Sequence, residues 1–199
     1  MLKPLCLTVL FATAIVPSSA IAAGNVEAGK VKSALCQGCH GEDGNSLAPN
    51  FPKLSGQFAG YIRKQIYNFK GGERKDDTMG PMAMTLTEKE DIEDIAAYFS
   101  SQAKMTGTPS ENTELVAQGE ALYKKHGCIG CHAPAGTGGT DSFPFIPVIG
   151  GQHKDYIIEQ FNKFRNGMRA NDTSGTMDGF AASLPAAEVE AIAEYLSTQ

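Results

Sequence analysis

Two short packets hold most of the cysteine and histidine in this chain. The first is Cys36-Gln37-Gly38-Cys39-His40, and the second is Cys128-Ile129-Gly130-Cys131-His132. The full sequence has five cysteines and four histidines, so four of the five cysteines fall in the packets. Each packet separates two thiols by two residues and places an imidazole directly after the second. Whatever chemistry explains one packet must also explain the other.

Four kinds of site use a Cys-x-x-Cys pair. Structural disulfides leave the following histidine unexplained, and a thioredoxin-like redox pair needs a βαβ pattern that this chain does not show. A zinc site needs four ligands close together, whereas the packets stand 92 positions apart. In c-type haem attachment, each cysteine forms a thioether with one vinyl group and the histidine ligates the iron. The repetition of the whole packet favours haem.

The chain is a tandem duplication. The packets repeat at an offset of 92, the segment 52–57 repeats as 147–152 at an offset of 95, and the segment 95–98 repeats as 192–195 at an offset of 97. Small loop insertions account for this drift. The offset of 95 also pairs Tyr61 with Tyr156, Gln65 with Gln160, Phe69 with Phe164 and Arg74 with Arg169.

Hydrophobic periodicity predicts an all-α fold with about three helices in each half. In each half, one helix precedes the packet, a second is amphipathic and a third ends the lobe. Ile92, Ile95, Ala96 and Phe99 recur at helical spacing in one of the third helices. The predicted helices span 26–36, 58–70 and 88–101 in the first half, and 113–128, 154–166 and 186–198 in the second.

A second axial ligand decides what a haem iron can do. An open position permits reactions with oxygen or peroxide, whereas a second strong ligand leaves electron transfer. His126 lies on the attachment side, and His153 has no counterpart in the first half, so neither is expected to ligate. Met79 and Met177 occur at matching points of the two halves, each seven residues before a leucine that leads into the third helix. We predict that these methionines are the axial ligands opposite His40 and His132.

Met82 and Met84 compete with Met79 in the first half. Counting back from the leucine selects Met79, and the residues that follow it align Met82 with the apolar Phe180 of the second half. The extra residue of the first half then falls between Leu86 and Tyr98, in the turn at 87–91. Met82 remains the alternative ligand.

The N-terminus resembles a cleavable signal peptide. Lys3 precedes an apolar run, and Ala20 and Ala22 fit the small-x-small pattern of a signal peptidase site. Cleavage would remove Cys6 and change the formal net charge from −5 to −6. An acidic chain without a basic tract argues against a nucleic-acid partner. We expect four segments: 1–22 a signal peptide, 23–103 an N-terminal lobe, 104–112 a linker, and 113–199 a C-terminal lobe.

On these residues, each half resembles a class I cytochrome c, and the chain resembles the dihaem cytochrome c4 family of bacterial periplasms. The resemblance implies two lobes related by a pseudo-twofold axis, each wrapped around one covalent haem c with histidine and methionine ligands. It also implies that the carbonyls of Pro52 and Pro147 accept the N–H of the axial histidines. Gly29 and Gly119 would allow the first helix of each lobe to approach the last.

The resemblance implies an electron carrier of the periplasm rather than an enzyme. Its partners would be a quinol-oxidising cytochrome bc complex or another donor, and a terminal oxidase as acceptor. Members of the family often associate with the membrane. The alternative is the dihaem cytochrome subunit of a redox enzyme such as flavocytochrome c sulfide dehydrogenase.

Two matched basic pairs stand near the ends of the second helices: Lys70 with Arg74, and Arg165 with Arg169. These side chains are either solvated helix ends or partners of the haem propionates or of the other lobe.

Overall fold

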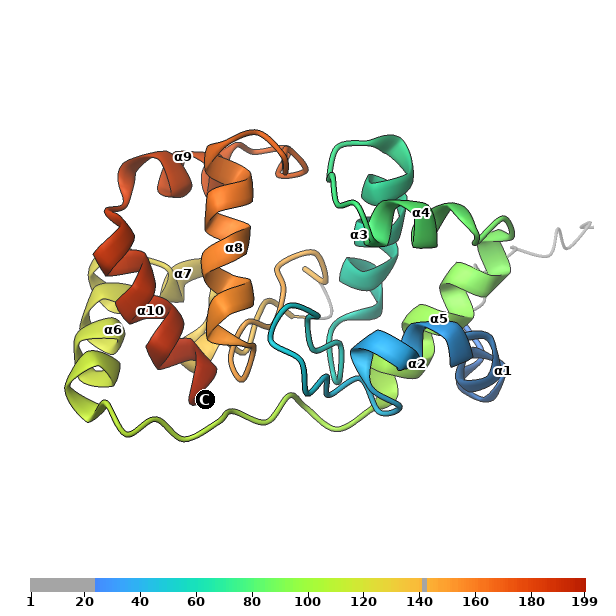
Figure 1. Cartoon of the computed structure of the whole chain (residues 1–199), viewed down its shortest axis with the longest axis horizontal. Coiled ribbons are helices and arrows are strands. Elements are labelled where there is room, and N and C mark those ends of the chain that lie inside the picture. Colours follow the sequence, from blue (N-terminus) through green and yellow to red (C-terminus); the bar gives the residue numbers. More distant parts are fainter. Residues whose placement is uncertain (1–23, 141–142) are drawn as a thin grey trace, which may run out of the picture.

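Two helical lobes, joined by an extended segment, make up the part of the chain that this computed structural model describes, residues 24–140 and 143–199 (Figure 1). The predicted signal peptide, with Cys6, lies outside these residues. The first lobe contains α1 (Val26–Lys32), α2 (Ala34–His40), α3 (Ala59–Gly71), α4 (Met79–Met84) and α5 (Lys89–Ser101). The second contains α6 (Thr113–Lys125), α7 (Ile129–His132), a 3-10 turn η1 (Pro134–Gly136), α8 (Lys154–Arg165), α9 (Thr176–Ser183) and α10 (Ala186–Ser197).

The predicted helical fold is confirmed, with some changes at helix ends. The helix expected over 26–36 ends at Lys32, and a new helix, α2, begins at Ala34 and includes the first packet. The helix expected over 113–128 ends at Lys125. The short helices α4 and α9 were not predicted. Neither lobe has a strand among its described residues, and one isolated antiparallel bridge pairs Arg74 with Arg169.

The first helix of each lobe crosses the last at a glycine. A Cβ on Gly29 would lie 2.0 Å from the Asp94 carbonyl oxygen of α5, and a Cβ on Gly119 would lie 1.9 Å from the Ala191 carbonyl oxygen of α10. Any side chain larger than hydrogen would force the helices apart, so both glycines have the role that the resemblance implied. The two first helices also begin alike: the Asn25 and Asn112 side chains accept from main-chain N–H groups of the first turn.

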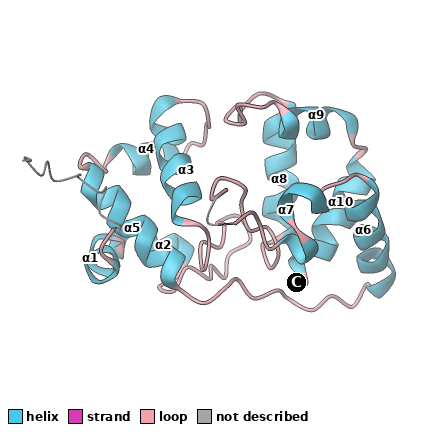
Figure 2. Ribbon diagram, turned by 180° about the vertical axis from the view of Figure 1, so that it is seen from behind, coloured by secondary structure: helices cyan, strands magenta, loops and turns pink. Residues whose placement is uncertain are grey.

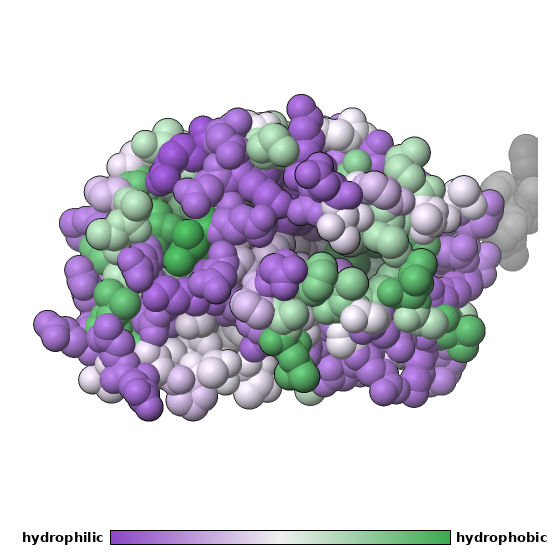
Figure 3. All heavy atoms as spheres, in the orientation of Figure 1, coloured by the Kyte–Doolittle hydropathy of each residue, from purple (hydrophilic) through white to green (hydrophobic). Residues whose placement is uncertain are grey.

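Each lobe has its own hydrophobic core. In the first, Ile62 and Ile66 of α3 pack with residues of α5, of which Phe99 is fully buried. In the second, Phe161 and Phe164 of α8 pack with α6 and α10. Polar side chains cover most of the face shown in Figure 3, and apolar ones gather in small patches. The two separate core clusters indicate two folding units rather than one shared core.

The second helices α3 and α8 face one another across the middle of the molecule, as Figures 1 and 2 show from opposite sides. The linker runs along one edge and is fixed to the second lobe, where the Thr108 N–H donates to the Ser197 carbonyl at 2.8 Å. Among the described residues, no helix is long and apolar enough to span a bilayer.

Candidate haem sites

The first packet lies on a helix, which brings its chemical groups to one face. Cys36, Cys39 and His40 occupy positions i, i+3 and i+4 of α2, so their side chains are neighbours. Cys36 and Cys128 are half-buried, and Cys39 and Cys131 are exposed. Two cysteines beside a histidine, repeated in two matched packets, suit attachment of two external groups.

The packet histidines are held by the main chain of a following loop. The Nδ1 atom of His40 lies 2.8 Å from the Pro52 carbonyl oxygen, and that of His132 lies 3.1 Å from the Pro147 carbonyl oxygen. A carbonyl only accepts, so Nδ1 carries the proton and the Nε2 lone pair is left for a metal. Burial lowers the pKa of both imidazoles, which keeps them neutral. The two hydrogen bonds implied by the resemblance are present, and the iron-ligand role stays a prediction.

Met79 and Met177 each lie in the first turn of a short helix. The Met79 N–H donates to Asp76 Oδ1 at 2.8 Å, and the Met177 N–H donates to Asp172 Oδ2 at 2.6 Å. Four residues after each methionine stands a fully buried alanine, Ala83 or Ala181. This match supports the predicted register, in which Met79 corresponds to Met177 and Met82 to Phe180. Met84 is 59% exposed.

The ends of these methionine helices are held by the basic residues that the sequence singled out. The Lys70 ammonium donates to the Leu86 carbonyl. In the second lobe, Arg165 donates to the Ala181 carbonyl at 2.7 Å and to the Leu184 carbonyl at 2.9 Å. Lys70 and Arg165 therefore act within their own lobes, and neither reading from the sequence anticipated this use.

The other two basic residues, Arg74 and Arg169, cross between the lobes. Arg74 donates to Tyr156 Oη at 2.6 Å and to Gln160 Oε1 at 2.7 Å. Arg169 donates to Tyr61 Oη at 2.9 Å. Both guanidinium groups are buried, at 6% and 7% exposure. The expectation that some of these basic residues pair with the other lobe is confirmed for this pair.

The buried interface fits the acidic edge of a haem. Across the described ranges, neither Arg74 nor Arg169 has a carboxylate at ion-pair distance, although an uncompensated buried charge is costly. Beside them, the Gln65 Nε2 donor is buried without a hydrogen-bond partner, while its Oε1 accepts from Arg74 at 2.8 Å. Two cations and a spare donor suit the anionic propionates of two haems. The donor sets of both lobes therefore fit the group that the packets imply.

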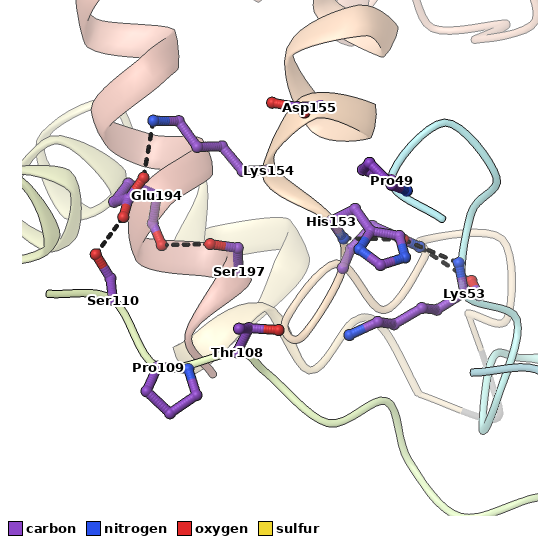
Figure 4. A pocket seen from close by; sticks show the side chains of 11 residues that line it. Pro49, Lys53, Thr108, Pro109, Ser110, His153, Lys154, Asp155, Glu194 and Ser197 are labelled. Atoms are coloured by element: carbon purple, nitrogen blue, oxygen red, sulfur yellow. Dashed lines mark hydrogen bonds and ion pairs between the residues drawn. The ribbon is translucent and has the colours of Figure 1, made fainter. Parts of the chain in front are cut away.

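The remaining histidines have other partners. His126 Nε2 lies 2.7 Å from Glu188 Oε2. His153 Nε2 lies 2.9 Å from the Ser46 carbonyl oxygen of the first lobe. His153 also lines a cleft of about 340 Å³ where the two lobes meet the linker (Figure 4). Lys53, Thr108 and His153 come to this cleft from the first lobe, the linker and the second lobe, and none of the predicted haem ligands lines it.

Sequence reasoning missed Asp76 and Asp172, and it recorded Gln57 and Gln152 only as members of a repeated segment. Each glutamine side chain hydrogen-bonds to the main chain of the other lobe. The repeat itself held the signal, because polar residues kept at matching positions are candidates for a contact between the two copies.

Known proteins resemble the chain over both lobes. A family model described as "Cytochrome c" matches residues 26–103, and one described as "Cytochrome C oxidase, cbb3-type, subunit III" matches residues 114–196. Cytochrome c4 of Pseudomonas aeruginosa is 44% identical, over 88% of this chain and 89% of the relative. The crystal structure of reduced recombinant cytochrome c4 from Pseudomonas stutzeri aligns with a TM-score of 0.80 at 42% identity, covering 88% of this chain and 99% of that chain.

A more distant relative is the "Thiosulfate dehydrogenase electron acceptor" of Stutzerimonas stutzeri, which is 33% identical over 81% of this chain and 77% of the relative.

Proposed function

Because the chain belongs to the cytochrome c4 family, we propose that it is a periplasmic carrier that passes electrons from a respiratory donor to a terminal oxidase. It is a dihaem c-type electron-transfer protein, and each lobe holds one covalently bound haem c. When bound, haem c supplies an iron that changes its charge by one electron. The donor we propose is a quinol-oxidising cytochrome bc complex or another periplasmic reductant.

The observation that carries the proposal is the matched pair of packets with their supported histidines. Cys36, Cys39, Cys128 and Cys131 attach the two haems. The Pro52 and Pro147 carbonyls hold the protons of His40 and His132 on Nδ1, which leaves each Nε2 lone pair available to an iron. Met79 and Met177 would supply the second ligands. With both positions filled, neither iron would have a place for substrate, which suits a carrier.

The side chains between the lobes also suit a carrier with two haems. Arg74 and Arg169 would neutralise propionates at the interface, bringing the acidic edges of the two groups to a buried region. Hydrogen bonds between lobes would keep their spacing fixed, which helps exchange of an electron within the molecule. Peripheral attachment to the membrane would bring the protein near its partners.

Kinetics with native membranes tests this proposal. Holoprotein is reduced, mixed with membranes from its own source, and followed by stopped-flow absorbance. Rapid oxidation that stops when the terminal oxidase is inhibited supports the carrier role, and failure of the membranes to oxidise either haem contradicts it. The reduced protein should also bind carbon monoxide only slowly near neutral pH, because two filled axial positions exclude the ligand. Rapid binding to half of the haem would instead indicate an open iron.

A second candidate is the electron acceptor of a sulfur-oxidising enzyme. The similarity to a thiosulfate dehydrogenase electron acceptor favours this role. A dihaem subunit of flavocytochrome c sulfide dehydrogenase, the alternative that the sequence suggested, would act in the same way. Native purification separates the candidates. A dehydrogenase that co-purifies at fixed stoichiometry and reduces the cytochrome with thiosulfate or sulfide supports the second, and a cytochrome that purifies alone supports the first.

A further inference from the structure

Each lobe holds the main chain of the other immediately after the proline that supports a haem histidine. Gln152 of the second lobe accepts from the Lys53 N–H at 2.9 Å and donates to the Lys53 carbonyl at 3.0 Å. Lys53 follows Pro52, whose carbonyl oxygen accepts from His40. The amide side chain thus satisfies both main-chain groups of one residue.

The same contact occurs in reverse. Gln57 of the first lobe accepts from the Val148 N–H at 3.0 Å and donates to the Val148 carbonyl at 2.8 Å. Val148 follows Pro147, whose carbonyl oxygen accepts from His132. A contact present in both directions reflects the duplication, and its repetition makes an accidental side-chain contact a poor explanation.

Both glutamines are fixed in place. Gln57 is 3% exposed and Gln152 is 5% exposed, so water does not compete for their hydrogen bonds. Their Oε1 atoms also accept from the next main-chain N–H, that of Phe58 or His153, at 3.1 and 3.0 Å. Each amide is therefore oriented by its own lobe before it meets the other.

The Pro52 carbonyl and the Lys53 N–H belong to one peptide unit, which is planar and rigid. His40 donates to the carbonyl oxygen at one edge of this unit, and Gln152 accepts from the N–H at the opposite edge. Hydrogen bonds in such a chain polarise and strengthen one another. Withdrawal of the Gln152 acceptor would therefore loosen the peptide plane and weaken the Pro52 oxygen as an acceptor for His40.

We propose that Gln57 and Gln152 are positioning residues, each of which sets the orientation and donor strength of the axial histidine in the opposite lobe. The proposal rests on the ligand role of His40 and His132 given above. It makes each haem sensitive to the packing of the other lobe through two hydrogen bonds and one peptide plane.

The test uses reduced holoprotein labelled with ¹⁵N in histidine, in which NMR reports the ring Nδ1–H of His40 and His132. In the parent protein, a large haem ring-current shift of both ring signals establishes ligation. Its absence would overturn the ligand assignment before any variant is made, and so would separate that failure from failure of the present proposal.

Gln152→Leu should move the His40 Nδ1–H signal upfield, because its hydrogen bond weakens, and leave that of His132 in place. Gln57→Leu should do the reverse. Gln102→Leu is the control and should move neither, because the Gln102 side chain bonds only at the end of the preceding helix α5, to the Tyr98 carbonyl and Ser101 Oγ. The proposal is overturned if a substitution moves the histidine signal of the lobe that carries it, moves both signals alike, or moves neither.

Glutamate variants serve if a leucine variant fails to fold. Gln152→Glu keeps an acceptor for the Lys53 N–H and adds negative charge to it. The His40 hydrogen bond should then strengthen, and its signal should move downfield, again without change at His132. Gln57→Glu should affect His132 in the same way. An upfield shift, or a shift in the variant's own lobe, would contradict the polarised chain.

Discussion

At the scale of single residues, the aspartates before the methionine helices do more than begin a turn. Burial alone would raise the pKa of Asp76, but Lys163 of the other lobe and the Met79 N–H hold that pKa below its ordinary value. Asp172 also has a lowered pKa, because the Met177 N–H offsets its burial. An ionised carboxylate at a helix N-terminus is favourable. The same device before Met79 and Met177 supports their correspondence.

Met79→Ala should therefore abolish the iron–sulfur charge-transfer band of one haem and lower that haem's reduction potential, because a methionine ligand favours the reduced iron. Absorbance near the band and a redox titration measure both effects. Met82→Ala is the matched control in the same helix and should leave both bands in place. If Met82→Ala removes a band and Met79→Ala does not, the register drawn for the first lobe is wrong.

At the scale of the elements, long helices could be predicted and short ones could not. The helices α3, α5, α8 and α10 repeat apolar residues over three or more turns, and their observed ends lie within one residue of the predicted ones. Helices α4 and α9 have six and eight residues, too few for a period to stand out. They form because aspartates hold their first turns and basic side chains bond carbonyls in or just after their last turns, which is tertiary information.

The position of the extra residue in the first lobe could be predicted by counting residues along the two repeats. Helix α5 begins three positions after Leu86, at Lys89, whereas α10 begins two positions after Leu184, at Ala186. The insertion therefore lies in the turn before α5, as predicted. It leaves both methionine helices in register with the cores beneath them, where Ala83 and Ala181 are fully buried.

Helix α5 is tied to the start of the chain by Asp94. Its side chain is 4% exposed and accepts from Lys32 Nζ and from the Asn25 N–H, both at 2.6 Å. These two donors, Lys32 first, hold the pKa of Asp94 below its ordinary value. A lowered folded-state pKa contributes stability above the unfolded value, about 3.9, and this contribution is lost as the pH falls through the folded value.

Asp94→Asn should thus lower the free energy of unfolding at pH 7, with about 1 kcal/mol coming from the weakened bond to the Asn25 N–H. The difference from the parent should shrink as the pH falls below about 4, because the unfolded parent then takes up a proton at Asp94 that the folded parent binds only at lower pH. Denaturant unfolding at pH 7 and at pH 3 measures it. Asp91→Asn, which alters a more exposed contact of Lys32, should cost less. A deficit of the same size at both pH values would contradict the assignment.

The crossing of α1 over α5 depends on Gly29. Gly29→Ala places a methyl group 2.0 Å from the Asp94 carbonyl oxygen, so the helices must separate at a cost of about 1–3 kcal/mol. Gly179→Ala is the control within α9, because nothing lies within 4 Å of its added methyl group. That change should raise stability by up to about 1 kcal/mol through helix propensity. Thermal unfolding of the two holoproteins should show opposite shifts.

At the scale of the whole molecule, the interface could be anticipated only in part. The offset of 95 identified Arg74 with Arg169 and Gln65 with Gln160 as equivalent pairs, but a repeat does not say which copy contacts which. In the structure, each arginine donates to both glutamines, that of its own lobe and that of the other. The symmetry is approximate, because Arg74 lies 2.7 Å from Gln160 whereas Arg169 lies 3.4 Å from Gln65 and also donates to Asn171 of its own lobe.

Lys53 is a place where the two lobes differ in charge. It is 7% exposed, and its ammonium donates to the Thr106 carbonyl at 2.6 Å and the Gly151 carbonyl at 2.8 Å. The equivalent residue of the second lobe is Val148, which has no charge. Lys53 directly follows the proline that supports His40, so its main chain adjoins the first haem site, while its ammonium lies against the linker and the second lobe.

A nearby buried cation favours the reduced haem, which has one positive charge fewer. Lys53→Met removes the charge at similar length and leaves the main chain free to bond Gln152. The reduction potential of the first haem should fall by roughly tens of millivolts relative to the second. Burial lowers the pKa of Lys53, so the parent should lose this charge at a pH below the ordinary lysine range. Its reduction potential should then approach that of the variant. Lys104→Met, which removes an exposed linker charge, should change both potentials little. Equal shifts of both haems in Lys53→Met would show instead that the charge acts on the molecule as a whole.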